Sequence, residues 1–120
     1  MLDLDDVSLE NENPFPAILQ GGTQEKIIHQ DDGKQFAILE ARHPEAAVHW
    51  LAVTYEDTGN TEDLMCNDRE RFLDLVDYAI NVAKAQSDEY PLLQQGFTIK
   101  FHCGAFETIP HAKLHILTTE

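Results

Sequence analysis

Cysteine is scarce in this sequence of 120 residues, which holds only Cys66 and Cys103. The two lie far apart and form no Cys-x-x-Cys pair, so neither a disulfide framework nor a cysteine-bound zinc site is indicated. Cys103 falls in an expected strand, where we predict a small buried residue. Nothing in this pattern implies a cofactor, and we expect none, metal included.

Basic residues are also few, since eight Lys and Arg stand against 22 Asp and Glu and give a formal net charge of −14 at pH 7. Such a charge repels phosphate backbones and anionic membrane surfaces, so we expect no nucleic-acid partner and no membrane partner. Long apolar runs are missing as well, because none approaches the roughly 20 residues of a membrane span. The acidic start is the opposite of a signal peptide, and we predict a cytoplasmic protein.

What remains predicts one folded domain, because 42% of the residues are hydrophobic and the chain is long enough to bury a core. Residues 1–12 are acidic and lack periodicity, so we interpret them as a flexible tail before a domain over residues 13–120. A short helix is expected after Pro16, ended by the glycine pair at 21–22.

The spacing of apolar residues and the turn signals predict an α+β fold with a mainly antiparallel sheet. The Asp32-Gly33 turn between two apolar runs indicates a β-hairpin. The five expected strands cover residues 25–30, 35–40, 47–53, 97–103 and 109–117. Trp50, in the central strand of this series, could anchor a base, but we predict that it packs in the core beneath a helix.

One long helix is predicted over about residues 67–86, where apolar side chains recur at steps of three and four residues. We expect it to start at Asn67, because Glu70 three residues later completes a pattern like a capping box. Loops are expected on either side, over residues 55–65 and 87–95.

The last expected strand carries the chemistry. Side chains alternate between faces in a strand, so its reactive residues share one face and its apolar residues the other, with His111, Lys113 and His115 opposite Ala112, Leu114 and Ile116. Two imidazoles beside an amine could bind a phosphate or a metal, or could form a solvated strand face. A metal would also need His49 or His102, because residues four apart in a strand lie about 13 Å apart and cannot share one ion.

Five segments, in their order and spacing, resemble one known family. Residues 18–22 (ILQGG) and 26–32 (KIIHQDD) resemble its opening I-I-x-G-x…K-I-V-Y-E-D-D, and residues 47–53 (AVHWLAV) are similar to P-G-H-x-L-V-I-P. Residues 96–99 (GFTI) resemble G-[FY]-[RT]-[LI], and residues 108–117 (TIPHAKLHIL) resemble [ST]-V-P-H-x-H-x-H-[VI]-[LI]. The chain is therefore similar, over about residues 13–117, to the histidine-triad (HIT) family of nucleotide-binding proteins.

The resemblance implies a HIT-like fold and assigns roles to particular residues. In the family, a middle histidine attacks the α-phosphate and forms a nucleotidyl-imidazole, supported by the outer two histidines and by another on the P-G-H strand. In this sequence the outer pair are His111 and His115, and the strand histidine is His49. The middle position is Lys113, so the family's nucleophile is missing.

Other positions depart from the family pattern too. The nearest match to a ribose-binding aspartate is Glu40, one residue out of register, and His102 stands where an asparagine is common. The glycine-rich loop is shortened to residues 104–107 and contains Phe106 and Glu107. Thr108 could still donate a hydrogen bond to a ligand, although Glu107 beside it opposes an anion.

Two functions follow as hypotheses. The first is a degenerate HIT-like protein that has lost nucleotidyl hydrolysis and keeps, at most, a pocket for a small molecule, nucleotide or anion near His49, His102, Thr108 and the residues of the last strand. The alternative is an active nucleotide hydrolase or nucleotidyltransferase in which Lys113 replaces the nucleophile, which requires the amine to lose its proton. The resemblance further implies a homodimer with one sheet continuing across two subunits.

Overall fold

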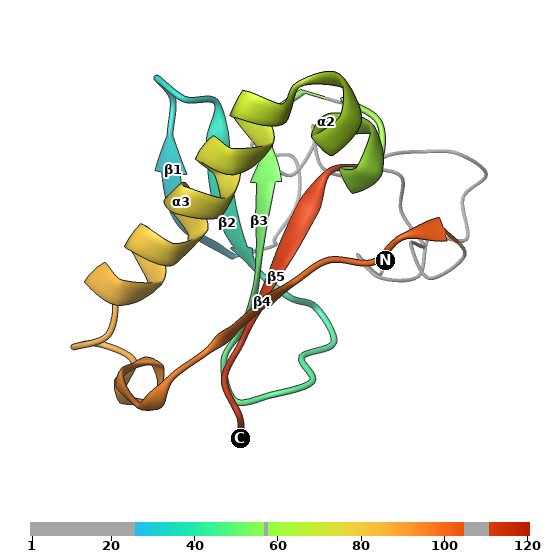
Figure 1. Cartoon of the computed structure of the whole chain (residues 1–120). Helices are drawn as coiled ribbons and strands as arrows, with labels where there is room; N and C mark the ends of the chain where they lie inside the picture. Colours follow the sequence, from blue (N-terminus) through green and yellow to red (C-terminus); the bar gives the residue numbers. More distant parts are fainter. Residues whose placement is uncertain (1–25, 57, 105–110) are drawn as a thin grey trace.

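The computed structural model describes residues 26–56, 58–104 and 111–120 (Figure 1). Its centre is a five-stranded antiparallel sheet in the order β1-β2-β3-β5-β4. The strands are β1 (Ile27–Asp31), β2 (Phe36–Glu40), β3 (His49–Thr54), β4 (Thr98–Lys100) and β5 (Lys113–Leu117). The predicted α+β fold with a five-stranded antiparallel sheet and one long helix is confirmed.

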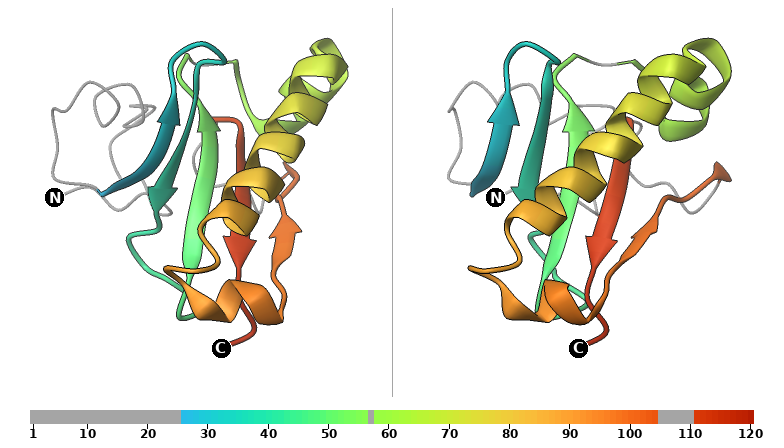
Figure 2. Two further views of the ribbon diagram at one scale, coloured as in Figure 1. Left: turned by 90° about the vertical axis from the view of Figure 1, so that its left-hand side faces the viewer. Right: turned by 60° about the vertical axis from the view of Figure 1, so that its left-hand side comes forward.

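The helices follow β3 in the chain. They are α2 (Thr61–Asn67), α3 (Arg69–Ala85) and the 3-10 helix η1 (Pro91–Gln95). Figure 2 shows α3 running obliquely across the strands, with η1 at its far end where the chain turns into β4. None of the helices in the described ranges is long and apolar enough to cross a membrane.

Two apolar clusters, one on each face of the sheet, explain why β3 and β5 are buried throughout. The larger cluster joins Trp50, Leu114 and Ile116 to the apolar stripe of α3, which includes Leu75 and Ala79. Burying that stripe is what holds α3 on the sheet. Trp50 is 1% exposed, so its predicted place beneath the helix is confirmed.

The second cluster lies on the opposite face and draws its buried members from strands and strand ends: Ala37, Leu39, Ala41, Leu51 and Val53. No residue of α2, α3 or η1 belongs to it. Because side chains alternate along a strand, the residues of β3 and β5 that do not face α3 project toward this cluster.

The prediction of a loop over residues 55–65 was wrong in its second half, where α2 begins. Asn60 caps this helix, since its side chain accepts from Asp63 N–H while the Asp63 carboxylate accepts from Asn60 N–H. The capping box therefore lies here and not at Asn67 and Glu70. The long helix α3 begins at Arg69, and the side chain of Asp68 caps it by accepting from Arg71 N–H.

Smaller differences concern strand and loop ends. The strand expected over residues 97–103 is limited to Thr98–Lys100, and Cys103 beyond it is exposed instead of buried. The loop expected over residues 87–95 ends in η1, with Pro91 at its start. The acidic tail over residues 1–12 and the short helix expected after Pro16 lie outside the described residues.

Candidate functional site

The candidate site lies on the sheet face opposite α3, where β3 and β5 run side by side. Leu51 pairs with His115 and Val53 pairs with Lys113 in the antiparallel register. Directly paired residues share a face, so Lys113 and His115 stand on the face of the second apolar cluster. The alternation predicted for the last strand therefore holds within β5.

This face is not solvated. The exposed fractions are 1% for His49, 4% for Lys113 and 4% for His115, and His111 is fully buried. The reading of these residues as an ordinary solvated strand face was therefore wrong. Buried polar groups are costly to retain unless they are hydrogen-bonded, so their partners define what the site can do.

His49 and His115 form a directed pair. The backbone N–H of Glu45 donates to His49 Nδ1 at 3.0 Å, so the His49 ring carries its proton on Nε2. That proton is donated to His115 Nδ1 at 2.9 Å. His115 must then carry its own proton on Nε2, and this atom is buried with no hydrogen-bond partner among the described residues. The pair therefore ends in a buried N–H donor.

The His115 ring is held neutral. Burial lowers its pKa to about 3, together with the neighbouring His49, His102, Lys113 and Lys100. At neutral pH His115 is thus an uncharged hydrogen-bond donor.

Lys113 stands where the resemblance places the nucleophile. Its Nζ donates to the backbone carbonyl of His111 at 3.4 Å, so the side chain folds back along its own strand. A cation held in a buried face attracts an anion, and its neutral neighbour His115 adds a directional donor.

His111, the first residue of the predicted row, lies outside β5. It lies at a bend just before β5, and its Nε2 donates to the carbonyl of Thr54 at 2.7 Å. Thr54 ends β3, and its hydroxyl donates to the Glu56 carbonyl at 2.9 Å. His111 therefore fastens the start of β5 to the end of β3.

The structure brings only some of the other predicted site residues close to the site. The ring of His102 stands edge-on to that of His115, with centroids 5.0 Å apart, so His102 does approach the site. Glu40 does not, because it is exposed at the end of β2 and pairs with Trp50, which faces α3. Leu39, one residue earlier, occupies the face of the second apolar cluster. Thr108 lies outside the described residues.

Three contributors were missed by sequence reasoning. Thr61 is fully buried at the start of α2 and bonds to the backbone of Lys113. The backbone carbonyl of Thr54 accepts the hydrogen bond from His111 Nε2, and Lys100 adds positive charge near His115. The alternation of β4 could have placed Lys100 on this face, but nothing in the sequence marks the two threonines.

A metal centre is not supported by the described part of the chain, where no three His, Cys, Asp or Glu side chains are grouped to hold an ion.

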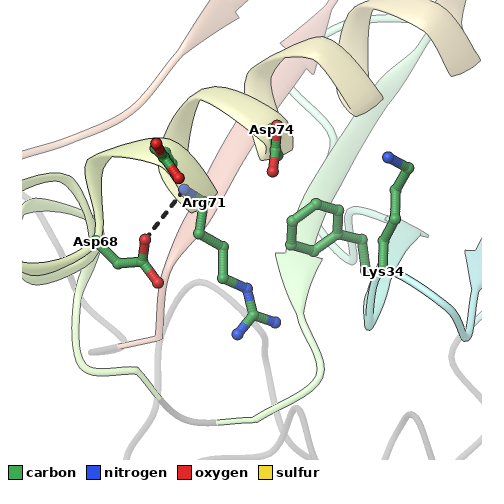
Figure 3. A pocket seen from close by; sticks show the side chains of 6 residues that line it. Lys34, Asp68, Arg71 and Asp74 are labelled. Atoms are coloured by element: carbon green, nitrogen blue, oxygen red, sulfur yellow. Dashed lines mark hydrogen bonds between the residues drawn. The ribbon is translucent and has the colours of Figure 1, made fainter.

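A separate hollow of about 310 Å³ lies on the α3 side of the molecule (Figure 3). Its walls come from the β1–β2 turn, β2 and the first turns of α3, with residues Lys34, Phe36, Asp68, Glu70, Arg71 and Asp74. None of the predicted site residues lines it.

Solved structures of HIT proteins share this fold. A HIT family hydrolase from Clostridium thermocellum aligns with a TM-score of 0.73 at 20% identity, over 94% of each chain. A histidine triad protein from Clostridium difficile aligns at 0.71 and 23% identity, over all of this chain and 95% of its own. A hypothetical histidine triad nucleotide-binding protein from Sulfolobus tokodaii gives 0.72 and 18%, over 88% and 67%. The class is thus that of the HIT fold.

A family model narrows this class. The family described as "Scavenger mRNA decapping enzyme C-term binding" matches residues 12–120. The chain therefore belongs to this HIT-like family. A search of curated protein sequences finds no match.

Proposed function

We propose that this chain is a HIT-fold protein without nucleotidyl hydrolase activity that keeps, at most, a pocket for a small molecule or an anion at Lys113 and His115. The observation that carries the proposal is the buried Lys113 side chain, which occupies the nucleophile position and donates to the His111 carbonyl. An ammonium has no lone pair, so it attracts the oxygens of a phosphate but does not attack its phosphorus.

The surrounding charges support an anionic occupant. The charges of Lys113 and Lys100 both lower the pKa of His115. The buried Nε2–H of His115 has no hydrogen-bond partner in the described structure. An acceptor oxygen beside that N–H would relieve a donor that is otherwise costly to bury. Glu40 lies on the other face, which removes the ribose contact that the resemblance suggested and favours a small anion over a whole nucleotide.

A titration tests the binding half of this proposal. Inorganic phosphate and AMP are added separately while the ring resonances of His115 are followed by NMR, with Lys113→Met as the variant and Lys34→Met, which removes a cation on the far side, as the control. We expect a saturable shift that Lys34→Met keeps and Lys113→Met loses, and that weakens with added salt. Equal binding by the Lys113→Met protein would contradict the proposal.

The second candidate function is nucleotidyl transfer through Lys113, favoured by its burial at 4% exposure. Here the Nζ lone pair would attack the α-phosphorus to form a P–N bond, while the leaving group departs with its bonding electrons and takes up a proton. Water would then cleave the P–N bond and release a nucleoside monophosphate. Mass spectrometry after incubation with adenosine phosphoramidate, diadenosine polyphosphates or sugar nucleotides would detect the adduct, with Lys113→Arg as the control. Because the family's description names mRNA decapping, an mRNA cap analogue belongs among the compounds to be tested.

A homodimer belongs to the proposal as well. β1 and β4 are the two edges of the described sheet, and a sheet that continues across two subunits must use one of them. Light scattering after size exclusion would contradict the dimer if it gave only the 13.6 kDa mass of one chain. Cytoplasmic location and the absence of nucleic-acid and membrane partners also remain proposals, supported by the charge of −14.

A further inference from the structure

A single hydroxyl group joins α2 to the candidate site. Thr61 Oγ1 lies 3.1 Å from the backbone nitrogen of Lys113 and 3.1 Å from its backbone oxygen. It therefore accepts from the N–H and donates to the C=O of the same residue. Thr61 is fully buried, so water cannot replace it without local opening.

The Thr61 hydroxyl makes the two backbone hydrogen bonds that a neighbouring strand would otherwise make to Lys113. β4 pairs with β5 only at His115, Ile116 and Leu117, so within the described sheet no β4 residue is paired with Lys113. In an antiparallel ladder, a neighbouring strand would supply both an acceptor and a donor to such a residue. The Thr61 side chain supplies both instead.

The hydroxyl is itself held in place. Thr61 directly follows Asn60, whose capping box with Asp63 fixes the first turn of α2. Leu64, one turn later, is 2% exposed and belongs to the core beneath α3. The position of Thr61 is therefore set by the capped helix and by the core.

We propose that Thr61 is the positioning residue for the Lys113 amine, so that α2 determines where the cation of the proposed anion site stands. The Lys113 side chain folds back to the His111 carbonyl, and a small rotation of the Lys113 backbone would move Nζ away from it. The two hydrogen bonds of Thr61 hold this backbone on the side of β5 where β4 does not pair with it. The inference rests on the proposed function for its ligand, but its effect on Lys113 can be measured without any ligand.

The chain offers a matched control in Thr118, which is 6% exposed. Its Oγ1 accepts from Val48 N–H at 3.2 Å and contacts the Val48 carbonyl at 3.5 Å. Thr118→Val therefore removes a similar pair of hydrogen bonds just beyond the other end of β5. A merely structural role for Thr61 would make the two valine variants behave alike.

The experiment uses full-length protein carrying lysine labelled with ¹³C at Cε, with the Lys113 resonance assigned by Lys113→Arg. We expect Thr61→Val to move this resonance toward those of the exposed lysines, while Thr118→Val leaves it in place and Thr61→Ser keeps or restores it. We also expect Thr61→Val to weaken the binding of inorganic phosphate about tenfold, the equivalent of about 1.4 kcal/mol. An unchanged Lys113 resonance in Thr61→Val would overturn the proposal.

A measurement on the wild-type protein covers the case in which Thr61→Val does not fold. The hydroxyl proton of Thr61 is shielded from solvent, so it should be visible by NMR and should shift when inorganic phosphate is added, whereas that of Thr118 should not. If inorganic phosphate binds at His115 and the resonance of the Thr61 hydroxyl does not change, the positioning role is wrong. If neither inorganic phosphate nor AMP binds, the proposed binding function fails, while the comparison of Thr61→Val with Thr118→Val, which needs no ligand, still tests the role of Thr61.

Discussion

The hydrogen bond between His49 and His115 predicts that removing one of the two buried rings lowers stability, and that removing the second ring as well restores it. In His49→Leu, His115 Nδ1 loses its donor in a buried site, and an unsatisfied buried polar group costs about 1–3 kcal/mol. The Glu45 N–H also loses its acceptor, but Glu45 is exposed and water can replace the ring. We therefore expect His49→Leu to lower the free energy of unfolding by about 1–3 kcal/mol.

Adding His115→Leu to that variant should restore stability. The second substitution removes both the orphaned Nδ1 and the Nε2–H that is already unpartnered in the described structure. The double variant should therefore be more stable than His49→Leu alone, by about 1–3 kcal/mol. Urea denaturation of the two single variants and the double variant measures this difference. If the two effects simply add, to within roughly 0.5 kcal/mol, the pairing inferred from the geometry is wrong.

Three further predictions concern other parts of the molecule. Lys113→His should fold normally and stay inactive on adenosine phosphoramidate, because Glu40 faces away from the site; robust turnover would show that the rest of the site is intact. Leu114→Ala should cost about 2–5 kcal/mol in urea denaturation, because its side chain fills the core beneath α3, whereas a surface residue such as Leu73→Ala should cost far less. Glu56→Gln should cost less than about 1 kcal/mol, since the carboxylate paired with Arg71 is 49% exposed. Burial raises the pKa of Glu56, but the hydrogen bond and charge of Arg71, together with a backbone hydrogen bond and the charge of His111, outweigh burial and hold the pKa below 4.5. The contribution of the pair is thus complete above pH 4.5 and is lost as the pH falls through the lowered pKa, so the stability difference between wild type and Glu56→Gln should disappear in acid.

Local patterns were sufficient to predict most of the fold. The Asp-Gly turn, the apolar run of β3 and the helical period of α3 are each contained in a short window, and the structure confirms all three. The helix α2 was missed because only Thr61 and Leu64 are buried in its seven residues, which is too few to produce a visible period. Its capping pair, Asn60 and Asp63, was the available signal.

The candidate site was predicted less well, because its properties depend on contacts between distant segments. Alternation correctly placed Lys113 and His115 on one face, but it could not show that the bend before β5 turns His111 toward Thr54. Burial of the row depends on packing across the whole sheet, which no local window contains. The role of Thr61 depends on the pairing of β4 with β5, which ends at His115. The periodicity of the sequence does not determine where such a pairing ends.

The central claim is that Lys113 serves as a buried cation and not as a nucleophile. Its most direct test is the release of nucleoside monophosphate, followed by ³¹P NMR, when wild-type protein and Lys113→Ala are incubated with adenosine phosphoramidate, diadenosine polyphosphates and the mRNA cap dinucleotide. The account predicts no turnover by either protein. Turnover by the wild type that disappears in Lys113→Ala would contradict it.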